Sequence, residues 1–161
     1  MADWIDQLQK KEEPQQECAR IRAQTQLHDA TIIKAKAHAI WRATIEHIRA
    51  DCEKLRRTFP ADKRRHCHSN ESDVGVTMVN EGPLPRMELY VGFNADGQCV
   101  DLIERQKIDR FQPAQERHSG RIEITVNEHE EVEFQHQGKV HTTPEDLAQA
   151  MLSRVCGIAS A

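Results

Sequence analysis

Aromatic residues are scarce in this chain of 161 residues, where Phe, Trp and Tyr together make up only 4%. A core built without them must be filled mainly by Val, Ile, Leu and Met, and such a core is thin for a chain of this length. The length itself suits one domain with a hydrophobic interior. We therefore expect a single structural domain whose thin core can be completed by a second subunit.

Long apolar runs are absent as well. No stretch approaches the roughly 18 apolar residues that a membrane-spanning helix needs. The first residues, MADWIDQLQKKEE, lack the basic and then apolar segments of a secretory signal peptide. The five cysteines are odd in number, far apart and never in a C-x-x-C pair, which favours reduced thiols over a disulfide framework. These features predict a cytoplasmic protein without a membrane segment.

Motifs of catalysis and cofactor binding are also missing. The sequence contains no Gly-rich loop for phosphates and no G-x-S-x-G turn that would present a serine nucleophile. It has no second cluster of Cys and His residues with the spacing of a zinc site. We therefore predict no cofactor, and we favour a non-enzymatic protein over an enzyme.

The net charge of −4 hides an uneven distribution along the chain. Residues 1–70 carry 14 basic and 10 acidic side chains, whereas residues 71–161 carry 8 and 16. The simplest interpretation is that the two parts attract each other, within one chain or across a dimer. The alternative is that the basic part meets a polyanion, although nucleic-acid binders are usually basic overall and rich in exposed aromatic residues.

One long helical segment dominates the first part of the chain. Residues 15–57 contain neither Gly nor Pro, and an apolar stripe runs through them with a mean spacing of 3.6 residues, as in a straight α-helix. The stripe comprises Ala23, Leu27, Ala30, Ile33, Ala37, Ile40, Thr44, Ile48, Cys52, Leu55 and Phe59. Such a helix would be about 65 Å long, and a domain of about 30 Å cannot cover it. It must therefore break, or project and pair with another chain.

Both outcomes have support in the sequence. We expect a separate short helix over residues 3–13, with a break or kink at Pro14, and the LHDATI segment is the best place for a hidden turn. The many alanines instead favour a close helix pair in a homodimer. The interface that we predict for this homodimer consists of Leu27, Ile33, Ala37, Ile40, Trp41 and Ile48.

The segment KRRHCHSN, residues 63–70, lies in a basic connector. His66, Cys67 and His68 are the only candidates for a metal site, and we predict none there because three consecutive side chains rarely converge on one ion. The nearby cations, from Arg56 to His68, follow a helix C-terminus, whose carbonyl groups repel anions. A polar connector is therefore the preferred interpretation of this segment.

After the connector the apolar period changes to two, which is typical of strands. Alternating stretches and turn signals such as NADG, residues 94–97, predict an antiparallel sheet of five or six strands, with a polar excursion over residues 105–118. Thr143 and Pro144 then begin a C-terminal helix. We predict an α+β fold with a helical assembly region (1–59), a basic connector (60–73), and a sheet with its C-terminal helix (74–157).

The order of these elements is similar to that of the small acidic dimeric chaperones of bacterial secretion systems, and to cystatin-like and NTF2-like folds. This similarity concerns topology alone. Our leading hypothesis is an adaptor or chaperone-like protein that homodimerises through the long helix. One alternative is a ligand-binding or enzymatic domain with a pocket between sheet and helix, whose candidate groups are Tyr90, His118, His136 and Cys99. A further alternative is a regulator that contacts nucleic acid through the basic connector.

Overall fold

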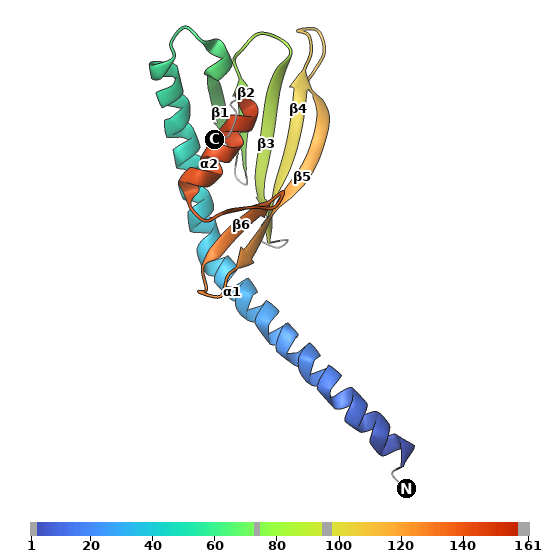
Figure 1. Cartoon of the computed structure of the whole chain (residues 1–161). Coiled ribbons are helices and arrows are strands. Elements are labelled where there is room, and N and C mark those ends of the chain that lie inside the picture. The colour runs from blue at the N-terminus through green and yellow to red at the C-terminus, as the bar shows by residue number, and fades with distance from the viewer. Residues whose placement is uncertain (1–2, 73–74, 95–97, 158–161) are drawn as a thin grey trace.

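A single helix, α1 (Trp4–Thr58), forms the first third of the computed structural model of this chain (Figure 1). The structure describes residues 3–72, 75–94 and 98–157. The carboxylate of Asp3 accepts a hydrogen bond from the Ile5 amide and caps the helix N-terminus. At 1.5 Å per residue, the 55 residues of α1 span about 80 Å, far more than the rest of the chain can cover.

The helix runs through Pro14 without interruption, so the break that we expected there does not occur. Proline removes only the amide that would bond to the Lys10 carbonyl, and both residues are exposed, so water can solvate that carbonyl. The LHDATI segment is helical as well. The sequence left open whether this region forms one helix or two, and the structure has one.

The remainder of the chain builds one antiparallel sheet and a second helix. The strands are β1 (Cys67–Glu71), β2 (Gly75–Asn80), β3 (Arg86–Asn94), β4 (Cys99–Lys107), β5 (Gln115–Val126), β6 (Val132–His136) and β7 (Lys139–His141). They follow one another in sequence order as a meander. A short 3₁₀ turn, η1 (Lys63–Arg65), precedes β1, and α2 (Pro144–Val155) ends the fold. The α+β prediction is confirmed.

The sheet has seven strands, whereas we predicted five or six. The additional strand, β1, lies in the range that we treated as a connector, and only its first residue, Cys67, is buried. The polar excursion is also shorter than expected, because β4 continues to Lys107 and β5 begins at Gln115. These added segments are mostly exposed or half-buried, so they lack the apolar alternation of a core strand. Residues 73, 74 and 95–97, which include most of the expected NADG turn, lie outside the described residues.

Both helices cover the same face of the sheet, and the core forms between them (Figure 1). The part of α1 from Ile33 to Cys52 packs on this face together with α2. Strands β2 to β6 place alternate residues there, such as Val76, Leu89 and Phe134. No described helix is both long and apolar enough to cross a membrane.

Candidate functional site

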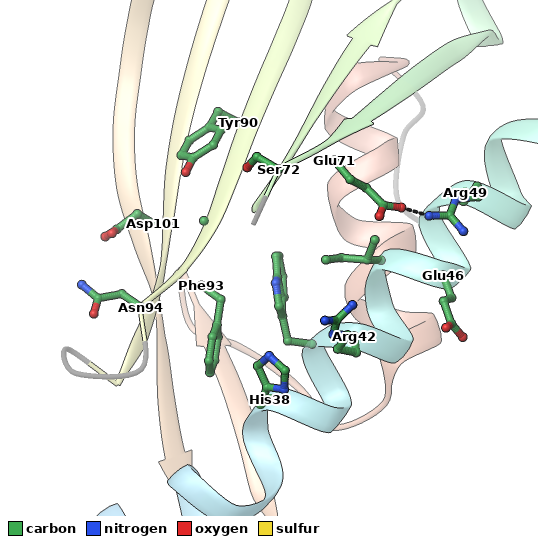
Figure 2. A pocket seen from close by; sticks show the side chains of 13 residues that line it. His38, Arg42, Glu46, Arg49, Glu71, Ser72, Tyr90, Phe93, Asn94 and Asp101 are labelled. Atoms are coloured by element: carbon green, nitrogen blue, oxygen red, sulfur yellow. Dashed lines mark hydrogen bonds and ion pairs between the residues drawn. The ribbon is translucent and has the colours of Figure 1, made fainter. Parts of the chain in front are cut away.

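A cleft of about 710 Å³ opens between α1 and the end of the sheet where β1 stops and β3 turns toward β4 (Figure 2). Its helix wall carries His38, Trp41, Arg42, Ile45, Glu46 and Arg49, and its sheet wall carries Glu71, Ser72, Tyr90, Gly92, Phe93, Asn94 and Asp101. Because 3.6-residue spacing brings positions 38, 41, 42, 45 and 49 to neighbouring faces of the helix, α1 alone supplies one whole side of the cleft.

An aromatic group forms the floor of the cleft. The Trp41 and Phe93 rings are stacked with centroids 6.3 Å apart, and the His38 ring meets Phe93 edge-on at 5.8 Å. Trp41 is only 3% exposed, so its ring is already covered by the protein. These contacts fix α1 against β3 and leave mainly polar groups facing the solvent.

Tyr90 lies on the other face of the sheet. Gly75 and Gly92 are paired across β2 and β3, and a Cβ atom on either one would contact the Tyr90 ring. Tyr90 therefore covers two adjacent glycines, and Asp101, the strand partner of Gly92, lies on the same face. Since Phe93 points to the opposite face, the cleft curves around the end of the sheet and is not a closed pocket.

The charges at the cleft are mixed. Arg49 forms an ion pair with Glu71, and Asp101 lies 3.4 Å from the Arg121 guanidinium. Ser72 donates its hydroxyl hydrogen bond to the Gly75 carbonyl, which leaves it without the partner base that a nucleophile requires. The described residues contain no group of three His, Cys, Asp or Glu side chains arranged to hold a metal ion. The described lining of the cleft is therefore polar and carries charges of both signs.

The predicted interface residues fall into two groups. Ile33, Ala37, Trp41 and Ile48 are buried in the core of this chain, and Ile40 is partly buried beside them. Leu27 is 71% exposed and lies where α1 has left the domain. Whether a second chain contacts any of them stays a prediction, and Leu27 is the member of the set that is free to do so.

In the HCH motif, Cys67 points away from the two histidines, both of which lie near the Glu81 carboxylate. The Cys67 side chain enters the core, where its sulfur lies 3.0 Å from that of Cys52. The His68 ring nitrogen lies 3.2 Å from a Glu81 carboxylate oxygen, and His66 is hydrogen-bonded to the Phe59 carbonyl at 2.6 Å. Strand alternation at the start of β1 separates the cysteine from both histidines.

The other candidate groups are distributed over the sheet. Of Tyr90, His118, His136 and Cys99, the cleft contains Tyr90. Cys99 is buried and donates to Asp101 at 3.8 Å, and burial raises its pKa. The sequence analysis missed His38, Arg42 and Phe93 at the cleft. The helical period places His38 and Arg42 beside Trp41, but only the strand register shows that Phe93 faces them.

Two cations at and next to the basic connector have local partners. Arg56 forms an ion pair with Glu81, and the Arg65 guanidinium lies 3.4 Å from Asp62 and stacks over the Phe59 ring at 4.3 Å. These contacts hold η1 against the end of α1. They reduce the positive potential that the connector can offer to a polyanion.

Two histidines near the C-terminal helix make stability depend on pH. Burial lowers the pKa of His136, with Arg154 as a further cause, and burial likewise lowers the pKa of His141. The unfolded chain therefore binds more protons than the folded one as the pH falls below about 6.5, and stability is lost in that range. We expect the double variant His136→Gln/His141→Gln to lose less stability than the natural chain between about pH 7.5 and about pH 5.5, measured by urea unfolding.

No protein-family model matches this chain, and neither does any curated protein or solved structure.

Proposed function

We propose that this protein acts through protein–protein contacts, as an adaptor or chaperone-like homodimer assembled by the N-terminal part of α1. This part, residues 4–30, is called the arm. Every residue of the arm from Trp4 to His28 is exposed, and Figure 1 shows it extending away from the sheet. The exposed arm is the observation that carries the proposal.

The arm continues the face of α1 that packs on the sheet. The core positions Ile33, Ala37, Trp41 and Ile48 belong to a stripe whose helical period extends back through Leu27 and Ala23. Five large apolar side chains are uncovered along the arm: Trp4 (70% exposed), Ile5 (53%), Leu8 (45%), Ile21 (50%) and Leu27 (71%). The second chain that we propose would cover the stripe where the sheet no longer does.

Helix stability also supports a partner for the arm. Most helical stability in proteins comes from tertiary packing, and a helix without such packing is marginal in water. Pro14 inside the arm costs about 3 kcal/mol relative to alanine. The arm gains little from local pairs, of which Arg20 with Glu17 is the clearest. Contacts with another chain offset these costs.

An antiparallel pair of arms fits the shape of the chain. The arm joins the domain where His28 lies 2.9 Å from Glu130, and Lys36 contacts the same turn between β5 and β6. Two parallel arms would bring both domains to the same end, where these turns occupy the helix surface. Antiparallel arms keep the domains at opposite ends.

The antiparallel register can be specified. A two-fold axis between Glu17 and Cys18 places Leu8 opposite Leu27 of the second copy. The same register places Ile5 opposite Ala30 of the second copy. Apolar contacts then lie at both ends of the paired arms.

The competing functions have weaker support. A ligand-binding pocket would bring several of the four candidate groups together, and the cleft contains only Tyr90 among them. A nucleic-acid interface would need free cations, and Arg56 and Arg65 are engaged with acidic side chains. The sheet face that carries no helix is left open in the dimer, and we assign partner binding to it.

Replacing Leu8 and Leu27 by glutamate tests the proposal. We expect the natural chain to approach twice the mass of one chain by sedimentation equilibrium at about 100 µM, and the Leu8→Glu/Leu27→Glu variant to stay a monomer. Four charged side chains would otherwise be buried in one interface, which costs several kcal/mol. The thermal unfolding of the domain should not change, because neither leucine contacts its core.

The matched control adds the same charge on another face of the arm. In Gln7→Glu/Thr25→Glu, both substitutions lie about 160° from Leu27 and about 100° from Leu8 on the helical wheel, at about 100° per residue. This variant should dimerise like the natural chain. A natural chain that is monomeric at this concentration would refute the proposal, and so would equal loss of dimer in both double variants.

A further inference from the structure

Three of the five cysteines meet at one point in the core, although they are far apart in sequence. Cys52 comes from α1, Cys67 from the start of β1, and Cys156 from the residue that follows α2. The Cys52 and Cys67 sulfur atoms are 3.0 Å apart. The Cys156 thiol donates to the Arg65 carbonyl at 3.7 Å and lies close enough to Cys67 to raise the pKa of that thiol. All three residues are buried. Cys67 therefore has a sulfur neighbour on each side.

This distance has chemical meaning. Thiol–disulfide exchange proceeds by attack of a thiolate on a sulfur atom, and reacting atoms held about 3–3.5 Å apart are in a near-attack arrangement. The described residues contain no group of three Cys, His or acidic side chains with metal-binding geometry. The arrangement of the three sulfurs therefore favours exchange between cysteines over a metal site.

A cavity gives access to one end of this cluster. It has a volume of about 370 Å³, and Cys156, Arg64, Arg86 and Arg154 are among its lining residues. Arg154 is paired with Glu104 at 3.0 Å, but the enclosed Nε atom of Arg86 has no hydrogen-bond partner. Arg64 and Arg86 bring positive charge to the lining of the cavity, which suits a ligand that carries carboxylates.

We propose that the three cysteines form a thiol–disulfide exchange site, in which Cys156 receives a carboxylate-bearing low-molecular-weight disulfide and Cys52 and Cys67 end as a disulfide. Glutathione disulfide is the probe for this class. The Cys156 thiolate attacks one sulfur of the probe, which forms a mixed disulfide and releases one thiolate. Cys67 then attacks the Cys156 sulfur and releases the second thiolate.

The last step moves the disulfide inward. The Cys52 thiolate attacks the Cys67 sulfur, which forms the Cys52–Cys67 disulfide and returns Cys156 as a thiol. Overall, two protein thiols are oxidised, one external disulfide is reduced to two thiols, and the two protons of Cys52 and Cys67 pass to these products. No other oxidant is needed.

The pKa values of the cluster suit this order of events. Contact with the Cys67 side chain is the main cause that lowers the pKa of Cys156, and it also lowers the pKa of Cys52. Hydrogen bonds to both neighbours, together with burial, raise the pKa of Cys67. Because Cys156 lines the cavity, it is the thiol of the cluster that an external disulfide meets first. Cys67 becomes a nucleophile when its proton passes to Cys52.

Glutathione disulfide added to the full chain tests the proposal, with non-reducing peptide mapping by mass spectrometry. The background variant Cys18→Ser/Cys99→Ser removes the two cysteines outside the cluster. We expect one glutathione on Cys156 first, and then loss of the adduct as a cross-link between the Cys52 and Cys67 peptides appears. Cys67→Ser should retain the mixed disulfide, Cys52→Ser should stop at a Cys67–Cys156 cross-link, and Cys156→Ser should form the final cross-link at least about tenfold more slowly.

A further variant tests whether the cavity beside Cys156 recognises carboxylates. Arg86→Gln should slow the reaction with glutathione disulfide several-fold and leave the reaction with uncharged 2-hydroxyethyl disulfide unchanged. If a variant at Cys52, Cys67 or Cys156 does not fold, the order in which the glutathione adduct and the cross-link appear in the background variant decides the test. The proposal is overturned if Cys156 carries no glutathione before the cross-link appears, or if no Cys52–Cys67 cross-link forms. Equal slowing of both probes in Arg86→Gln would overturn the role of the cavity.

Discussion

Truncating Phe134 to alanine should lower the free energy of unfolding by about 3–5 kcal/mol. Phe134 is 1% exposed, lies in β6, and is the largest fully buried side chain among the described residues. Its strand partners are Ile124 and His141, and its ring belongs to the cluster between the sheet and α1. A close-packed core relaxes only partly into the space that the ring leaves, so the cavity adds to the lost burial.

Phe111→Ala is the matched control for this prediction. Phe111 is 83% exposed, in the segment between β4 and β5, and its ring contacts the Arg110 guanidinium at 5.0 Å. We expect a change of about 0.5 kcal/mol or less, because little apolar area leaves water when this side chain folds. Urea unfolding followed by circular dichroism measures both values. Similar losses in the two variants would contradict the packing described for β6.

Gly75→Ala should also destabilise the domain strongly, through overpacking. A Cβ atom at residue 75 would lie 2.4 Å from the Val91 carbonyl oxygen and 3.0 Å from the Gly92 Cα atom. Both are backbone atoms of the adjacent strand β3, so neither can move without breaking the pairing of β2 with β3. Insertions of this size typically cost about 1–3 kcal/mol, and the rigid neighbours place this one at the upper end.

Gly120→Ala should have the opposite effect and stabilise the domain. A Cβ atom there would meet only the His118 ring at 3.4 Å, which is close to ordinary contact distance. Alanine restricts the unfolded chain more than glycine does, so the variant should be more stable by about 0.4–1 kcal/mol. Thermal unfolding of the two alanine variants measures both effects. A Gly75→Ala variant as stable as the natural chain would show that β2 and β3 do not approach as closely as described.

The prediction succeeded where local chemistry and burial agree. Thr143 caps α2 by accepting a hydrogen bond from the Asp146 amide, and Pro144 begins the helix, as the sequence indicates. The alternation of Val76 and Met78 in β2 places both on the covered face. In these segments the local preference and the tertiary environment favour the same conformation.

The prediction failed where pairing alone makes the structure. β1 has the sequence CHSNE, with one buried side chain, and it becomes a strand because its backbone bonds to β2. The first residues of β5 are exposed and polar, and their pairing with β4 extends the sheet beyond the apolar pattern. An edge strand needs no apolar alternation, so hydrophobic period cannot reveal it.

The sequence by itself determined the helix–sheet–helix order, the antiparallel sheet and a first helix too long for its domain, because these follow from period, capping and length. Only the tertiary structure decided that α1 is continuous, that Ile33 and Ile48 pack within the chain, and that the arm is exposed. It also brought Cys52, Cys67 and Cys156 together in the core, with the Cys52 and Cys67 sulfur atoms 3.0 Å apart. Contacts between residues distant in sequence depend on strand register and helix packing, and no local pattern in the sequence encodes them.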